Sequence, residues 1–326
     1  MVLSQASPLL LDSGLRDHLS SFIMRTGHAS IVFAHSRWDL VPTLVALGQG
    51  VYLIGWFLFF PYLPWWASML LGAGYAVYIL WNVDTISHNF LHNPFFRSRL
   101  LNRLFSIYES LVIGFSQVLY KHVHLRHHRG NSDKPDASGE TIDWLSIYRY
   151  GRNGEAENVW PYMWLGYFRD DALHTYREIK QRDPREARWG AAEVAAFVAM
   201  YVGAFLLNWK FMLCFLPCYY VGHSLSNLIG YYLHYGANPE VPLAWGVSSY
   251  GRLYNLFWFN NGYHAEHHYQ PQVHWTKMHE VYERFKEEQR KAGVHVIRAP
   301  HFLGFLDVLF PPHSAVVSTG NRPVPL

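Results

Sequence analysis

Residues 41–60 read VPTLVALGQGVYLIGWFLFF, twenty residues without a charged side chain. As an α-helix this run rises about 30 Å, which is the hydrocarbon thickness of a bilayer. A short link, PYLP at 61–64, leads to a second uncharged run at 65–83, WWASMLLGAGYAVYILWNV. Aromatic residues and prolines at the tip of such a pair are typical of a membrane interface. The two runs predict two transmembrane helices joined as a hairpin.

A second pair of apolar runs follows a long polar stretch. Residues 191–209 are interrupted only by Glu193, and residues 211–233 form the next run. We therefore expect an all-α integral membrane protein with four transmembrane helices in two hairpins. The apolar runs at 107–120 and 253–259 are too short, or too interrupted by a carboxylate, to cross a bilayer. They predict interfacial or docked segments.

Basic residues indicate the orientation of these spans. Of the 27 Lys and Arg residues, Lys210 alone lies in a hairpin tip. Because basic residues accumulate on the cytoplasmic side, both termini and the region between the hairpins are expected to face the cytoplasm. We expect an N-terminal cytoplasmic segment at 1–40, a membrane-bound domain at 41–275 and a C-terminal cytoplasmic tail at 276–326. The start of the chain does not have the shape of a signal peptide.

Composition excludes several classes of protein. The net charge of +3 is too small to indicate a nucleic-acid partner. Two cysteines, Cys214 and Cys218, cannot build a disulfide scaffold or a cysteine-ligated iron–sulfur or zinc site. The chain has 20 histidines against 24 Asp and Glu residues. Metal chemistry in this protein would therefore use imidazole ligands.

Three histidine clusters lie on the expected cytoplasmic side. They are HNFLH at 88–92, HLRHH at 124–128 and HAEHH at 264–268. On a helix, residues three or four apart share a face, so each cluster can direct two or three imidazoles at a common point. Since all three clusters follow or adjoin apolar runs on one side of the membrane, they predict a shared metal site in a cytoplasmic helical cap.

The last apolar run adds a polar stripe to this set. His223, Asn227, Gly230 and His234 recur at helical spacing on one face. Polar residues inside a membrane helix are costly unless they face a site or a partner. His234, at the cytoplasmic end, is expected to be a ligand, and His223, nearly three turns deeper, a hydrogen-bonded structural or tunnel residue. No role is assigned to His122, which precedes the second cluster.

The clusters, in this order around two apolar hairpins, resemble the histidine boxes of the integral-membrane desaturase and hydroxylase superfamily, in particular its fatty acid desaturase branch. The segment YNLFWFNNGYHAEHH at 254–268, followed by Pro271 and His274-Trp275, is similar to the third-box region of bacterial members. The resemblance implies two non-haem iron ions with histidine ligands. Carried over by position, the implied ligands are His88, His92, His124, His127, His128, His234, His264, His267 and His268. Asn227 or Asn261 is then a candidate to hold a metal-bound water.

Ligand histidines must be neutral, with the second ring nitrogen held by an acceptor. Carboxylates near the boxes are candidates for this role: Asp84, Glu109, Asp133, Asp136 and Glu266. Arg126, inside the second box, should point away from the cations. Arg97, Arg99 and Arg103 follow the first box and are candidates to bind a carboxylate or lipid headgroup, although basic residues at this place are also ordinary for a cytoplasmic flank.

The resemblance implies O2-dependent desaturation of a fatty acyl chain held as a lipid, acyl-CoA, acyl-ACP or free acid. Electrons would come from an external donor, such as a ferredoxin or a cytochrome b5-type protein with its reductase. Hydroxylation, carotenoid ketolation and oxidative decarboxylation by the same site stay open as alternatives. A membrane metal transporter or haem protein is the alternative of a different class, but its ligands would lie within the spans, whereas the box histidines lie outside them.

Overall fold

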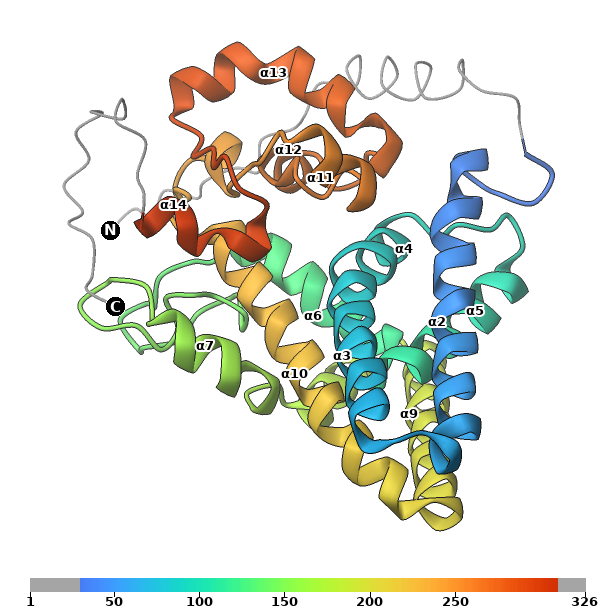
Figure 1. The fold of residues 1–326 in the computed structure, drawn as a ribbon. Helices are drawn as coiled ribbons and strands as arrows, with labels where there is room; N and C mark the ends of the chain where they lie inside the picture. The colour runs from blue at the N-terminus through green and yellow to red at the C-terminus, as the bar shows by residue number, and fades with distance from the viewer. Residues whose placement is uncertain (1–29, 310–326) are drawn as a thin grey trace.

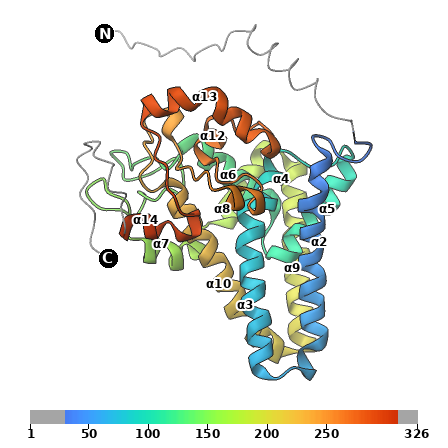
Figure 2. The same cartoon turned by 45° about the horizontal axis from the view of Figure 1, so that its top comes forward.

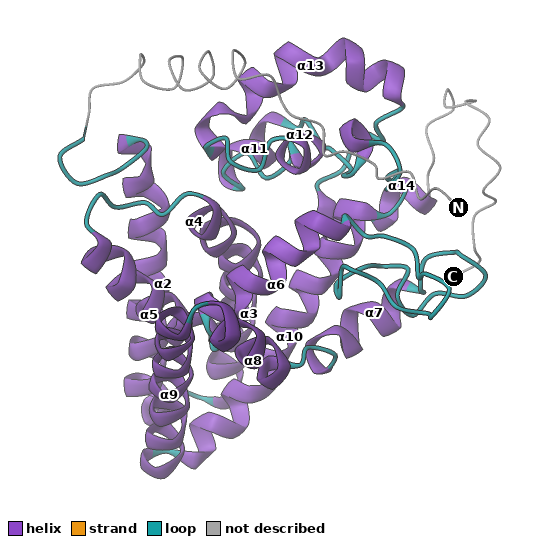
Figure 3. Ribbon diagram, turned by 180° about the vertical axis from the view of Figure 1, so that it is seen from behind, coloured by secondary structure: helices purple, strands orange, loops and turns teal. Residues whose placement is uncertain are grey.

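The computed structural model describes residues 30–309, and this part of the chain is helical without a β-strand (Figures 1 and 3). Four long helices form the body of the molecule: α2 (Leu40–Phe59), α3 (Trp65–Trp81), α9 (Pro184–Leu207) and α10 (Trp209–His234). The expected terminal segments 1–40 and 276–326 extend beyond the described residues, so they are observed only in part.

The shorter helices follow the long ones in chain order. Helix α3 continues through a π-helical segment, η3 (Asn82–Ser87), directly into α4 (His88–His92). The remaining α-helices are α5 (Arg99–Ile113), α6 (Gln117–Gly130), α7 (Val159–Leu165), α8 (Ala172–Arg182), α11 (Arg252–Phe257), α12 (His264–Tyr269), α13 (Met278–Ala292) and α14 (Phe305–Leu309). Single helical turns are η1 (Arg37–Asp39), η2 (Phe60–Tyr62), η4 (Gly166–Phe168), η5 (Pro242–Ala244), η6 (Trp275–Lys277) and η7 (His301–Leu303).

Three helices of the described region are long and apolar enough to cross a membrane. They are α2 with its flanking turns, α3 continued through α4, and α9. The fourth predicted span, 211–233, lies within the 26-residue helix α10, which is not among them. Helix α10 carries the polar residues His223, Ser224 and Ser226 in its second half. The α2–α3 and α9–α10 connections lie at the narrow end of the molecule, opposite α11–α13 (Figures 1 and 2).

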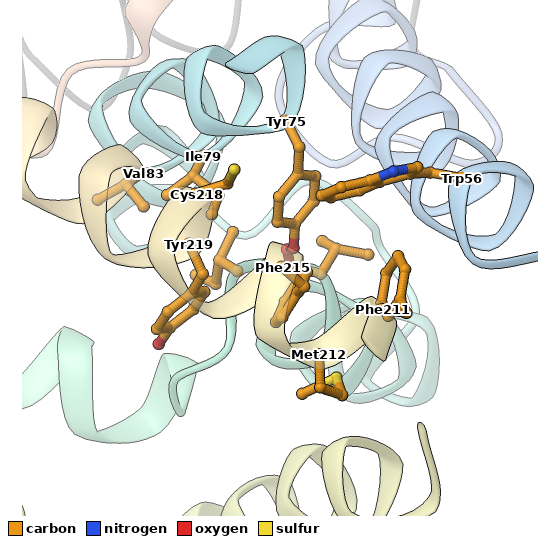
Figure 4. Packing of buried hydrophobic residues seen from close by; sticks show 11 residues of the cluster. Trp56, Tyr75, Ile79, Val83, Phe211, Met212, Phe215, Cys218 and Tyr219 are labelled. Atoms are coloured by element: carbon orange, nitrogen blue, oxygen red, sulfur yellow. The ribbon is translucent and has the colours of Figure 1, made fainter. Parts of the chain in front are cut away.

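An aromatic cluster joins α2, α3 and α10 (Figure 4). Trp56 of α2 meets Phe211 of α10 edge to face with ring centroids 4.9 Å apart, and Tyr75 of α3 lies 5.4 Å from Phe215. The Tyr75 hydroxyl also donates a hydrogen bond of 2.6 Å to the carbonyl of Val112 in α5. Offset and edge contacts of this kind favour one arrangement of the rings. They fix the relative positions of the helices that lead to the histidines.

Glu193, the carboxylate that interrupts the third apolar run, is fully buried. It accepts hydrogen bonds from the hydroxyls of Ser106 (2.5 Å) and Ser116 (2.6 Å) and from the backbone N–H of Val118 (3.0 Å). These donors belong to α5 and to the beginning of α6, where a negative charge also meets the positive end of the helix dipole. The run 107–120 is therefore a docked segment, divided between α5 and α6 by a turn at Gly114.

Close packing of α10 on α3 makes Gly222 a sensitive position. A Cβ there would lie 2.8 Å from the Ile79 Cβ and 2.9 Å from the Ala76 carbonyl oxygen. Gly222→Ala should therefore lower the stability of the purified protein in detergent, because an overpacking cost of about 1–3 kcal/mol exceeds the helix-propensity gain of up to about 1 kcal/mol. Gly203→Ala in α9, where a Cβ meets nothing within 4 Å, is the control. Equal melting temperatures for both variants would contradict this packing.

Candidate metal centre

The nine histidines that the sequence marks as ligands come together in two adjacent groups. They are contributed by α4, α6, α12 and the last residue of α10. Five form one group: His88, His92, His124, His128 and His267. Four form the other: His127, His234, His264 and His268. Within each group, one ring nitrogen from each histidine lies within 4.8 Å of those of the others.

The helical spacing alone suggests that each HxxHH cluster directs its histidines at one point. The structure shows instead that each of these clusters is divided between the two groups. His124 and His128 belong to the five-histidine group, whereas His127 belongs to the other. Likewise His267 is separated from His264 and His268. Neighbouring residues of a helix point about 100° apart, so each cluster contributes to both groups. In each HxxHH cluster the last two histidines, adjacent in sequence, therefore belong to different groups.

The Nε2 atoms of the five-histidine group face each other at short range. His88 lies 3.0 Å from His267, and His124 lies 2.9 Å from both His92 and His128. The His267 and His128 nitrogens are 3.0 Å apart. In the second group, the His264 and His234 Nε2 atoms are 3.1 Å apart.

Several of these rings have a fixed tautomer. Nδ1 of His127 lies 2.7 Å from the Asp143 carboxylate, and Nδ1 of His234 lies 3.1 Å from the Trp245 carbonyl. Since both partners accept hydrogen bonds, each Nδ1 carries the proton and each Nε2 directs a lone pair into the group. Nδ1 of His268 similarly lies 2.5 Å from Oδ1 of Asn131. The Asn131 amide is oriented by donating to the His128 carbonyl at 2.7 Å.

This donor set fits transition-metal ions. Two imidazole nitrogens bound at right angles to one ion at about 2.1 Å are about 3.0 Å apart. The observed Nε2 separations of 2.9–3.1 Å agree with that value. The buried Nε2 of His268 has no hydrogen-bond partner among the described residues, as expected of an atom that coordinates an ion. Each of the two groups can thus hold one metal ion.

Burial keeps these rings neutral. Desolvation, together with the neighbouring histidines, holds the pKa of His124, His264 and His268 well below the ordinary value. The same two causes lower the pKa of His128 and His267. Neutral imidazole is the form that binds a metal, so the protein is prepared for ligation at neutral pH.

The carboxylate that contacts the His127 ring belongs to Asp143, which was not among the candidates from the sequence. Asp143, buried in the segment between α6 and α7, also accepts from the backbone N–H groups of Ser132 (3.1 Å) and Leu145 (2.8 Å). Asp133, which was a candidate, instead accepts from the Asp143 N–H at 3.0 Å. It supports the loop that holds Asp143. Proximity in sequence favoured Asp133, and only the folded loop brings Asp143 to His127.

The other candidate acceptors have different partners. Glu266 is fully buried and accepts hydrogen bonds from the hydroxyls of Ser248 and Tyr250, each at 2.8 Å. Glu109 accepts from Ser87 at 3.2 Å, and burial raises its pKa to about 7. The Asp136 side chain caps its own loop.

The two asparagine candidates lie in different places. Asn227 donates to the Met163 carbonyl of α7 at 3.2 Å, away from the rings. Asn261 lines an opening that also reaches His88, His92 and His267. The buried Nδ2 of Asn261 has no partner among the described residues. Of the two, Asn261 is therefore placed beside a histidine group.

The two other histidines that the sequence analysis considered, His122 and His223, lie outside both groups. His122 contacts Glu178 at 3.1 Å, and His223 contacts the Ile113 carbonyl at 2.9 Å. Arg126 points away from the rings, pairs with Glu178 and stacks on Trp144 at 3.7 Å from the ring centroid.

Two of the three arginines after the first box have structural partners. Arg97 donates through Nε to the carbonyls of Ser30 and Phe33. Arg103 pairs with Glu186 of α9. Arg99 begins α5 and is exposed. The contacts of these three arginines do not bring their side chains together at one point.

Replacing Asp143 should weaken metal binding. Asp143→Asn removes the carboxylate that orients His127, so we expect about 10- to 100-fold lower affinity for a divalent ion in the four-histidine group. Metal analysis after graded exposure to a chelator measures this directly. Asp136→Asn, in the neighbouring exposed loop, is the matched control. If both variants retain metal equally, Asp143 does not support a ligand.

The lowered histidine pKa values also predict a pH dependence. Below about pH 6.5 these histidines bind protons in the unfolded chain but not in the folded protein, so the free energy of unfolding falls as the pH falls. The metal-free protein should therefore melt at a lower temperature at pH 5.5 than at pH 7.5. Melting curves of chelator-treated protein at both values check the sign. An unchanged or higher melting temperature in acid would contradict it.

Comparison with known proteins adds the family. A sphingolipid delta(4)-desaturase DES1-like protein of Oryza sativa subsp. japonica is 25% identical over 206 residues, which are 62% of this chain and 59% of the relative. A protein of the same name from Arabidopsis thaliana is 25% identical over 223 residues, 67% of this chain and 64% of its own length. The sphingolipid delta(4)-desaturase of Schizosaccharomyces pombe is 26% identical over 217 residues, 62% and 57% of the two chains.

The chain thus spans about three fifths of the length of these curated relatives. The family model for fatty acid desaturases matches residues 60–300, which include all nine histidines and the four helices that carry them. The chain belongs to the fatty acid desaturase family.

Proposed function

We propose that this protein is an O2-dependent diiron oxidoreductase that desaturates a fatty acyl-type chain at the membrane. The observation that supports this most is the pairing of two adjacent imidazole groups with Nε2 separations of about 3 Å. In this proposal all nine histidines are ligands. Membership of the fatty acid desaturase family supports the reaction class.

Two iron ions with O2 supply an oxidant that can remove hydrogen from an unactivated C–H bond. The chain's own groups prepare the site. Asp143, Asn131 and the Trp245 carbonyl hold the protons on the outer ring nitrogens, so that the inner nitrogens stay free to coordinate. The apolar helices α3 and α10 exclude water from the side of the site that faces the membrane.

Desaturation removes two hydrogen atoms from adjacent carbons, and reduction of O2 to two waters consumes two further electrons and two protons. An external donor must supply these electrons. A ferredoxin or a cytochrome b5-type protein with its reductase is the class of partner we propose.

The topology we propose keeps four spans, with α10 as the fourth. Its polar residues face inward: His223 contacts the Ile113 carbonyl, Asn227 contacts α7, and His234 joins the metal centre. A helix of this kind crosses a bilayer despite modest hydropathy because its polar groups are satisfied by protein. The termini and the histidine site would then face the cytoplasm, with the membrane-bound domain at 41–275.

The structure supports the two alternatives, a hydroxylase and a metal transporter, to different extents. Hydroxylation would use the same metal centre and differ only in the fate of the carbon after the first hydrogen is removed. A metal transporter needs ligands along a path through the spans. The nine clustered histidines instead lie at the helix ends and in short helices beyond them. The desaturase proposal therefore stands first and hydroxylation second.

A single variant tests the proposal through metal and product together. Membranes that contain the protein, supplied with reductase, donor and O2, should yield a product lighter than its acyl substrate by two hydrogen atoms. His267→Ala should lower iron content and abolish turnover while the protein stays in the membrane. His174→Ala, outside both groups, should change neither. A product heavier by one oxygen atom would establish hydroxylation, and full iron content in His267→Ala would refute the ligand assignment.

A further inference from the structure

Helix α7 and the turn η4 that follows it form an apolar segment within the polar region between the two hairpins. Residues 158–168 read NVWPYMWLGYF, eleven residues without a charged side chain. As a helix they rise about 16 Å, close to half of the hydrocarbon thickness of a bilayer, so the segment is too short to cross it. An apolar segment of this length is either buried in protein or placed at a membrane interface.

One face of this segment packs on protein, and the opposite face does not. Val159 and Tyr162 are buried in a cluster with residues of α10. Trp160, Trp164 and Phe168, at every fourth position, form an exposed aromatic face, in which Trp160 keeps 53% and Phe168 keeps 70% of its surface accessible. Soluble proteins rarely leave a contiguous apolar face in water. The aromatic face therefore needs an apolar partner.

The aromatic face continues the outer surface of α10. The Tyr220 ring of α10 lies with its centroid 5.8 Å from that of Trp164 and 5.5 Å from that of Phe168. Leu213 and Leu216 are exposed on the same side of α10 as Tyr220. Helix α7 lies beside α10, between the narrow end of the molecule and helices α11–α13 (Figures 1 and 2). With α10 as a membrane span, one apolar surface thus runs from the span onto α7.

The last turn of α7 does not depend on water for its hydrogen bonds. The carbonyl oxygens of Met163 and Trp164 lie where an α-helix leaves them without backbone partners. Asn227 of α10 donates to the first at 3.2 Å, and the Tyr220 hydroxyl donates to the second. A Cβ at Gly166 would lie 2.7 Å from Nδ2 of Asn227, so this close contact requires the glycine. Backbone groups satisfied by protein are what a hydrocarbon environment requires.

The two charged residues that border the segment neutralise each other. Glu157 precedes it and Arg169 follows it, and the Arg169 guanidinium donates two hydrogen bonds of 2.6 and 2.7 Å to the Glu157 carboxylate. The guanidinium also stacks on the Tyr150 ring, 4.1 Å from its centroid. A paired and stacked arginine is suited to the edge of an apolar surface. Directly beyond it, the exposed Asp171 caps α8, so the chain returns to water there.

From these contacts we propose that α7 and η4 lie in the interface of the cytoplasmic leaflet, with the aromatic face inserted among the lipid acyl chains beside α10. The partner of this surface is the bilayer itself. Tryptophan suits this depth because its ring is apolar and its N–H can reach the headgroups. The inference does not depend on the proposed reaction. It rests on the proposed function only in placing α10 in the membrane.

This placement connects the bilayer to the loop beside the metal centre. The Tyr162 hydroxyl of α7 donates to the Leu145 carbonyl at 2.7 Å, and the Leu145 N–H donates to the Asp143 carboxylate. The Tyr231 hydroxyl of α10 donates to the Glu157 carbonyl at 2.8 Å. Helix α7, held at the interface, therefore fixes the height of the Asp143 loop above the acyl chains.

Spin labels on single cysteines test this placement in the full-length protein, reconstituted in phosphatidylcholine vesicles. Both native cysteines are replaced by alanine. The test positions are Trp164→Cys and Phe168→Cys, with Leu216→Cys on α10 as the lipid-facing control and Glu283→Cys on the exposed side of α13 as the water-facing control. The measured quantity is the ratio of label collision rates with O2, which concentrates in hydrocarbon, and with a nickel chelate, which stays in water. Both test positions should give a ratio above that of Glu283→Cys and below that of Leu216→Cys.

The outcomes separate this inference from the proposed function. Ratios at both test positions equal to that of Glu283→Cys would overturn the interfacial placement. Low collision rates with both reagents, restored in nanodiscs that hold one copy of the protein, would show that a second copy covers the aromatic face and would overturn it as well. A water-like ratio at Leu216→Cys would instead refute α10 as a membrane span.

Tryptophan fluorescence provides a second measurement that keeps both native cysteines. Phosphatidylcholine brominated in its acyl chains quenches indole rings that it touches. Replacing Trp160 and Trp164 together by Phe should lower the fraction of emission that this lipid quenches. Trp144→Phe is the matched control, because the Trp144 ring stacks on Arg126 away from α7 and its loss should not lower that fraction. An equal quenchable fraction in the two variants would contradict the inference.

Discussion

Nine imidazole rings must stay unprotonated while their nitrogens lie about 3 Å apart, and this requirement organises the charges around them. A protonated ring would repel its neighbours and any cation between them. Arg126, although inside the second box, is turned outward to Glu178 and Trp144. Glu266 is hydrogen-bonded to the hydroxyls of Ser248 and Tyr250. Asp143 is the carboxylate that contacts a ligand ring, and it does so at the outer nitrogen.

Helices from distant parts of the chain bring the imidazole rings together. Helix α4, which continues the apolar helix α3 through η3, and the last residue of α10 carry histidines away from the narrow end of the molecule, whereas α6 and α12 carry three ligand candidates each. The aromatic contacts between Trp56, Tyr75, Phe211 and Phe215 fix α3 relative to α10. The geometry of the metal centre is thus determined partly by packing far from it.

Much of this arrangement could be predicted from the sequence, because charge-free runs and histidine spacing are local signals. The four long helices and the set of nine histidines follow from them. How the rings divide between the two groups could not be read from spacing, since His127 and His128 adjoin in sequence but belong to different groups. Asp143 was missed because its approach to His127 depends on a folded loop held by Asp133. Arg103 was considered for headgroup binding, yet its partner Glu186 is distant in sequence.

Glu193 has a consequence for how the protein is made. A lone carboxylate within an apolar helix opposes insertion of that helix into a bilayer by up to about 3 kcal/mol. Its donors, Ser106, Ser116 and Val118, all precede α9 in the chain. They have therefore left the ribosome before the helix that needs them. The order of synthesis therefore makes these hydrogen-bond donors available before α9 itself is complete.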